Sequence, residues 1–152
     1  MNQSSKLKFY LINLFSLITL TCPLLPWMSY GVGSKTGMDI GGKPANFIFL
    51  LSFLLIVISY ILFKTNKIRK FFLYTMLFLS LSVCAIYFYE LTKIGYQTMI
   101  AKNLPVEMFG VVSLATNQIR IGYGLWVGSA ASLLSLIINY ISIRIKSQKG
   151  II

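Results

Sequence analysis

Four long stretches without any charged residue constrain this chain more than any other feature of its sequence. They cover residues 9–28, 45–63, 71–89 and 123–143, and each is predominantly apolar. A helix needs about 20 apolar residues to cross about 30 Å of hydrocarbon. Because lipid offers the backbone no hydrogen-bond partners, such stretches cross it as helices. The sequence therefore predicts an all-α integral membrane protein with four transmembrane helices.

The basic residues are distributed unevenly between the two sides of these spans. The chain has 14 Lys and Arg, three Asp and Glu, no His and a net charge of +11. The outer loops, 29–44 and 90–122, hold all three acids and only five of the basic residues. The positive-inside rule therefore places both termini and the connector 64–70 in the cytoplasm. The nine basic residues on that side are Lys6, Lys8, Lys64, Lys67, Arg69, Lys70, Arg144, Lys146 and Lys149.

The spans form one domain over residues 1–152, because no loop is large enough to fold alone. The cytoplasmic connector 64–70 is short and predicts an antiparallel pair of helices. The first outer loop is rich in glycine, which indicates a flexible or tightly turned backbone. In the second, residues 91–104 lack proline and can prolong the third helix, which Pro105 should end.

Two groups of residues within the spans are candidates for helix contacts. Gly124, Gly128 and Ser132 are spaced by four and share one helix face, which lets two helices approach closely in lipid. The contact lies either within the bundle or between protomers. Asn13 and Asn139 lie at similar depths. They either join the first and fourth spans, within or between chains, or each bonds to a backbone carbonyl.

The ends of the spans carry residues typical of membrane interfaces. Trp27, Tyr30, Tyr123 and Trp126 mark outer ends, where we expect them to anchor the chain at headgroup level. The cytoplasmic basic residues should bind anionic headgroups or a cytoplasmic protein partner. The orientation of the protein in the membrane and the binding of lipid explain these basic residues, so we do not expect the chain to bind nucleic acid directly. The docking candidates are Lys64, Lys67, Arg69, Lys70, Arg144 and Lys146.

Three further features leave alternatives open. Cys22 and Cys84 lie at similar depths, where buried free thiols are expected and a disulfide is geometrically conceivable. Glu90 precedes Lys93 by one helical turn, which indicates a solvated ion pair. Hydroxyl side chains within the spans could line a passive pore: Ser16, Thr19, Ser52, Ser59, Ser80, Ser82, Ser129 and Ser135.

The residue types argue against an enzyme. The chain has no His, and its sequence offers no paired carboxylates and no spacing of metal ligands. No ionisable residue lies within the predicted spans, whereas coupled pumps and transporters place such groups at membrane depth. We therefore expect no catalytic, cofactor or metal site.

In its topology over the whole chain, the sequence resembles small bacterial four-span membrane proteins. These include the KwaA membrane subunits of Kiwa anti-phage defence and bacteriocin immunity proteins. The resemblance implies a homo-oligomer that senses membrane disturbance, or transmits it to a cytoplasmic partner. The leading hypothesis is thus a non-enzymatic, self-associating sensor, anchor or effector subunit in antiviral defence, located in the cytoplasmic (inner) membrane of a bacterium. The alternatives are a passive channel or small-transporter subunit and a toxin or bacteriocin immunity protein.

Overall fold

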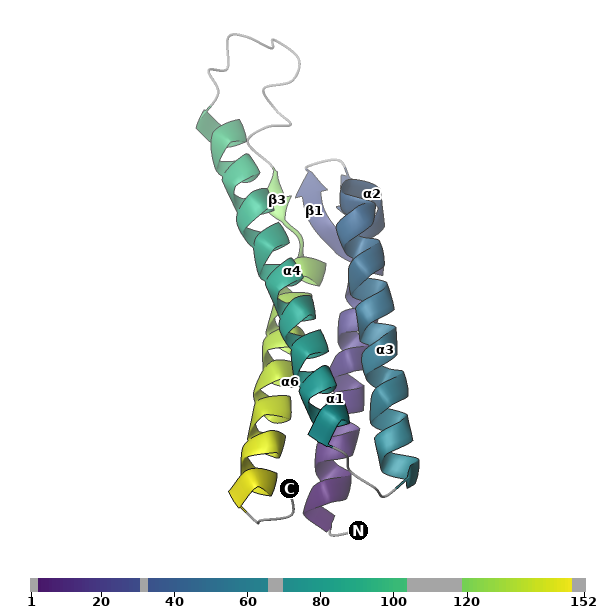
Figure 1. The fold of residues 1–152 in the computed structure, drawn as a ribbon. Coiled ribbons are helices and arrows are strands. Elements are labelled where there is room, and N and C mark those ends of the chain that lie inside the picture. The colour runs from purple at the N-terminus through teal and green to yellow at the C-terminus, as the bar shows by residue number, and fades with distance from the viewer. Residues whose placement is uncertain (1–2, 31–32, 66–69, 104–118, 149–152) are drawn as a thin grey trace.

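The computed structural model describes residues 3–30, 33–65, 70–103 and 119–148. This part of the chain is mostly helical and contains four helices long and apolar enough to cross a membrane, as the sequence predicts. They are α1 (Gln3–Thr21), α3 (Lys43–Thr65), α4 (Lys70–Asn103) and α6 (Tyr123–Gln148). Each helix packs against two others, in the ring α1–α3–α4–α6 (Figure 1).

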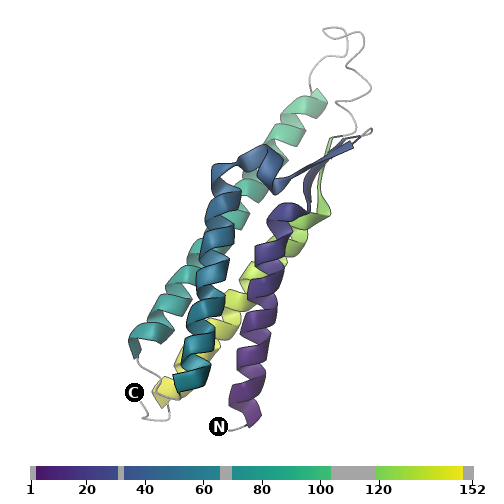
Figure 2. The ribbon, with the colours of Figure 1, turned by 90° about the vertical axis from the view of Figure 1, so that its right-hand side faces the viewer.

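Both the beginning of α1 and the end of α6 lie at one end of this bundle, which we call the termini end (Figure 1). A small sheet lies at the opposite end, which we call the sheet end (Figure 2). In the orientation predicted from the basic residues, the sheet end is the outer one.

The bundle has an apolar outer surface and an interior in which apolar and polar side chains are mixed. Large apolar side chains such as Leu17, Phe53 and Phe78 are more than half exposed on the outer faces of the helices. The inner faces bury a core of apolar side chains together with small hydroxyl side chains, among them Ser52 and Ser80. A protein surrounded by hydrocarbon has no need to bury its apolar residues and gains from enclosing its polar ones.

The sheet was not predicted, and it corrects the prediction of an all-α fold. It contains β1 (Pro26–Tyr30), β2 (Gly33–Thr36) and β3 (Arg120–Ile121), in the antiparallel order β2–β1–β3. The first helix is correspondingly shorter than the predicted span 9–28. It ends at Thr21 and is followed by a 3₁₀ turn, Cys22–Leu24. Pro23 and Pro26 explain this, since neither has the backbone N–H that a continuing helix requires.

The other outer segments differ from the predicted loops 29–44 and 90–122 in two places. A short helix, α2 (Gly37–Gly41), precedes α3, and the Thr36 side chain accepts a hydrogen bond from the Asp39 amide in a capping box at its start. Helix α4 continues past Tyr89 to Asn103, two residues before Pro105, as the absence of proline over 91–104 allows. Its 34 residues correspond to about 50 Å, so α4 is longer than the hydrocarbon is thick.

Candidate functional site

The most elaborate side-chain arrangement lies where the bundle meets the sheet, and it starts from Pro23. In a regular helix the carbonyl of Thr19 would accept a hydrogen bond from the N–H of residue 23, which proline lacks. The phenol of Tyr87 in α4 donates to this carbonyl instead, at 2.7 Å. The bond joins α4 to α1 across the diagonal of the four-helix ring.

Pro26 creates a similar situation one turn further on. It removes the N–H that would lie four residues after Cys22, and the Cys22 carbonyl accepts hydrogen bonds from the Leu25 amide and the Trp27 indole, at 3.1 and 3.0 Å. Trp27, in β1, is 0% exposed. The indole is therefore fixed inside the protein by a hydrogen bond as well as by packing.

Trp27 and Tyr87 also contact each other, and we call this pair with its two carbonyl acceptors the aromatic latch. The ring centroids are 6.0 Å apart and both side chains are fully buried. Glycines make room for the rings, because a Cβ on Gly37 would meet the Trp27 indole and one on Gly128 would meet the Tyr87 ring. The latch thus connects the sheet with α1, α2, α4 and α6.

The start of α6 approaches the same region through two further glycines. A Cβ on Gly122 would collide with the Pro26 carbonyl, and a Cβ on Gly124 would meet Leu25. The Gly122 amide donates to the Trp27 carbonyl at 2.7 Å. Ser132, two turns further along α6, is buried and donates to the Ser129 carbonyl.

The small-residue stripe Gly124, Gly128 and Ser132 is therefore used inside the chain. Of the two alternatives left open by the sequence, a contact within the bundle describes what the structure shows. A contact between protomers would have to use another face.

Trp27 does not lie where the sequence placed it. It was predicted to anchor the chain at the membrane interface, but its burial leaves no surface for headgroups. An amphipathic ring near the end of a span can lie either at the membrane interface or inside the protein. Here the indole N–H of Trp27 donates to the Cys22 carbonyl inside the protein. Tyr123 and Trp126 are both more than half exposed and Tyr30 is partly exposed, as interfacial residues require.

Asn13 and Asn139 do not bond to each other within the chain, so the first of the two alternatives for these residues is not what the structure shows there. The Asn13 amide donates to the Phe9 carbonyl at 3.0 Å and to the Ser59 hydroxyl of α3 at 3.2 Å. The amide nitrogen of Asn139 is buried and has no hydrogen-bond partner among the described residues. The partner of Asn13 belongs to α3 because that helix packs beside α1 with a hydroxyl at the right depth.

The hydroxyl side chains proposed as a pore lining face the interior with one exception. Ser82 is only partly buried and bonds to the Phe78 carbonyl of its own helix. The other seven are buried, among them Thr19 and Ser52, whose hydroxyls lie 3.1 Å apart across α1 and α3. Both cysteines are free and buried, which agrees with the expectation of free thiols.

Glu90 is not the solvated ion pair expected from the sequence. Its side chain is 0% exposed, on the same face of α4 as Tyr87 and one turn nearer the sheet end. Lys93, which is 38% exposed, reaches both carboxylate oxygens at 3.4 Å. The burial of this carboxylate could not be read from spacing, because it depends on which face of α4 the other helices cover.

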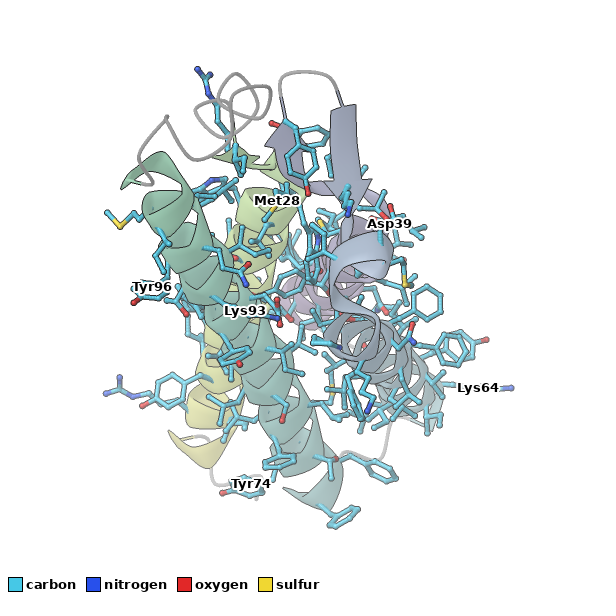
Figure 3. The ribbon with its side chains drawn as sticks, turned by 90° about the horizontal axis from the view of Figure 1, so that it is seen from above. Met28, Asp39, Lys64, Tyr74, Lys93 and Tyr96 are labelled. Atoms are coloured by element: carbon cyan, nitrogen blue, oxygen red, sulfur yellow. The ribbon has the colours of Figure 1, made fainter. Side chains whose placement is uncertain are left out.

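The basic docking candidates are only partly described. Lys64 and Arg144 are exposed at the termini end, and Figure 3, a view from the sheet end, shows Lys64 pointing away from the bundle. Lys67 and Arg69 lie outside the described residues, and Lys70 and Lys146 belong to helices whose side chains there are not described.

No family model matches the chain, and no curated protein or solved structure matches it either. Within the described residues, no three His, Cys, Asp or Glu side chains gather into a group that could hold a metal ion. The candidate site is the aromatic latch, because its buried contacts join the sheet to four helices. The latch was not predicted from the sequence, although Pro23 and Pro26 mark two carbonyls in need of donors.

Proposed function

We propose that this chain is a non-enzymatic, self-associating sensor or anchor subunit of a bacterial inner membrane, with both termini in the cytoplasm. One observation carries the sensor function: the aromatic latch joins the outer sheet to the transmembrane helices through buried contacts. A change in the sheet therefore acts on the packing of the helices. The exposed cytoplasmic Lys64 and Arg144 supply positive charge for anionic lipid or an acidic partner.

The experiment measures whether the two ends of the bundle respond together. The variant Trp126→Phe leaves Trp27 as the only tryptophan, so its emission reports on the latch. In the same chain, Cys22→Ala and Cys84→Ala remove the native thiols, and a fluorophore on Arg144→Cys reports on the other end of α6. In proteoliposomes of increasing bilayer thickness, both signals should change over the same range of lipids.

The latch variant Tyr87→Phe provides the control. It keeps the ring but removes the donor to the Thr19 carbonyl, and it should separate the two responses. Responses that are independent in the parent chain would refute the coupling. Self-association is measured separately, by the mass of the purified complex in lipid nanodiscs, where a strict monomer would refute it.

A passive channel is the second candidate, because seven of the eight proposed hydroxyl residues do face the bundle interior. The latch argues against an open path, since two fully buried aromatic rings occupy the sheet end of the interior. Conductance of the purified protein in planar bilayers distinguishes the two functions. A sensor should show no current, and a stable current would favour the channel.

A further inference from the structure

Helix α4 carries two charged residues within a long apolar run. Between Phe71 and Tyr96 they are Glu90 and Lys93, and every other residue there is uncharged. Glu90 is 0% exposed, and the Lys93 ammonium reaches back along the helix to both carboxylate oxygens, at 3.4 Å. A lysine near the end of a membrane span usually extends outward to the headgroups. Lys93 instead neutralises a carboxylate that lies inside the bundle and nearer the termini end.

The outer face of α4 stays uncharged beyond Tyr89, where the predicted span ends. Phe78, Tyr89 and Tyr96 are 67%, 63% and 68% exposed and fall on one stripe of the helix. Thr92, between the last two, is exposed, but its hydroxyl donates to the Phe88 and Tyr89 carbonyls and so does not need water. Figure 3 shows Tyr96 pointing away from the bundle. The stripe therefore continues to Tyr96 without a break.

The predicted span of this helix is shorter than the hydrocarbon that it would cross. From Phe71 to Tyr89 an upright helix covers about 27 Å, against about 30 Å of hydrocarbon. Figure 1 shows α4 inclined to α3, and a tilt shortens the depth that a helix covers. From Phe71 to Tyr96 the helix is about 38 Å long, which lets both aromatic residues reach the headgroup layers.

The sheet gives the same boundary on α4. The exposed Ser34 and Lys35 of β2 need water or headgroups, so the sheet lies outside the hydrocarbon. A Cβ on Gly95 would lie 3.7 Å from the Ile121 side chain of β3, which places this part of α4 level with the sheet. Glu90 precedes Gly95 by five residues, so it lies about 7.5 Å nearer the termini end. The headgroup layer thus meets α4 near Gly95.

We propose that lipid covers the outer face of α4 as far as Tyr96, so that Glu90 and Lys93 form an ion pair at the sheet-side edge of the hydrocarbon. The partner that this face fits is the acyl chains of the leaflet on the sheet side, because the face is uncharged and continuous with that of Phe78. Charged residues at this depth pair with one another and face the protein interior. The boundary is therefore two turns beyond Tyr89. This inference does not depend on the proposed sensor function.

Spin labels measure how deep this face lies. In a chain with Cys22→Ala and Cys84→Ala, single cysteines carry a nitroxide in proteoliposomes. Its collisions with oxygen, which concentrates in hydrocarbon, are compared with its collisions with a nickel chelate, which stays in water. Phe78→Cys gives the hydrocarbon reference and Ser34→Cys the water reference. Thr92→Cys should give an oxygen-to-nickel ratio close to that of Phe78→Cys and several-fold above that of Ser34→Cys.

Two results of this experiment would overturn the proposal. A ratio at Thr92→Cys equal to that of Ser34→Cys would show that the hydrocarbon ends below Glu90. Dipolar broadening between labels at Thr92, with few collisions of either kind, would show that a second copy of the chain covers this face in place of lipid.

Thermal unfolding in lipid nanodiscs tests the ion pair itself. Lys93→Met leaves an unpaired carboxylate at membrane depth, so the midpoint should fall clearly. Glu90→Gln added to the same chain should recover most of this loss, because no charge remains. Arg120→Met, which removes an exposed basic residue of the sheet, is the control and should change the midpoint little. An unchanged midpoint in Lys93→Met would show that the pair is solvated and would refute its place in the hydrocarbon.

Discussion

At the scale of single residues, the aromatic latch depends on how closely a ring and a backbone can approach. The Tyr87 ring lies where the side chain of any residue larger than glycine would project from position 128. The ring cannot give way easily, because its hydroxyl bonds to the Thr19 carbonyl and it lies beside the Trp27 indole, with the ring centroids 6.0 Å apart. Gly95, on the same helix as Tyr87, has no such constraint, since a Cβ there would meet Ile121 only at 3.7 Å.

We therefore expect opposite effects from the same substitution at these two glycines. Gly128→Ala should lower the free energy of unfolding by about 1–3 kcal/mol through overpacking. Gly95→Ala should leave it unchanged or raise it by about 0.5–1 kcal/mol, because alanine favours the helix. Thermal unfolding in detergent, followed by circular dichroism, measures both. Similar losses in the two variants would contradict the close contact between Gly128 and Tyr87.

At the scale of elements, the end of α1 is decided by Pro23, and Tyr87 compensates for the missing donor. Tyr87→Phe should cost about 1 kcal/mol of unfolding free energy, as side-chain hydrogen bonds in membrane proteins do. In a Pro23→Ala background, residue 23 can donate to the Thr19 carbonyl itself, so the same substitution should cost less. A double-mutant cycle in detergent measures the difference. Strictly additive effects would show that the phenol does not replace the proline's missing N–H.

Helix α2 offers a prediction about pH. Asp39 accepts hydrogen bonds from the Thr36 hydroxyl and amide at 2.7 and 3.0 Å, and these bonds, with the charge of Lys35, hold its pKa below the ordinary value. The ionised carboxylate therefore stabilises the cap above the ordinary pKa of Asp, and this contribution is lost as the pH falls through the lowered pKa. The carboxyl ¹³C shift of Asp39 should titrate below the usual range.

Thr36→Val removes the hydroxyl with little change in shape and is the matched variant. Its Asp39 titration should move toward the ordinary value, because the largest cause of the lowered pKa is gone. An unchanged midpoint would contradict the role of the Thr36 hydroxyl in the capping box.

These elements also show what the sequence could and could not predict. The helices were predictable because long apolar runs are a local property of the sequence. The predicted spans 45–63 and 123–143 begin and end within a few residues of the bounds of α3 and α6. The sheet was not, because Met28 pairs with Ile121, which lies more than ninety residues away. Local pattern likewise could not show that Trp27 faces Tyr87 or that Asn13 meets Ser59.

At the scale of the whole molecule, the apolar outer surface and the partly polar interior make two adjacent residues respond differently. Ser52 is fully buried and bonds to Thr19, whereas Phe53 is 56% exposed on the outer face of α3. Ser52→Leu should lower the free energy of unfolding by about 1–3 kcal/mol, because it overpacks the interior and removes one of the two hydrogen-bond partners of the Thr19 hydroxyl. Phe53→Leu should change it by less than about 0.5 kcal/mol, since one apolar surface replaces another.

Unfolding in detergent micelles and in lipid nanodiscs separates the roles of solvent and of neighbouring chains. If Phe53 faces hydrocarbon, its substitution should be neutral in both environments. A loss that occurs only in nanodiscs would place Phe53 at a contact between copies of the chain. A loss as large as that of Ser52→Leu in both environments would contradict the assignment of the outer face to lipid.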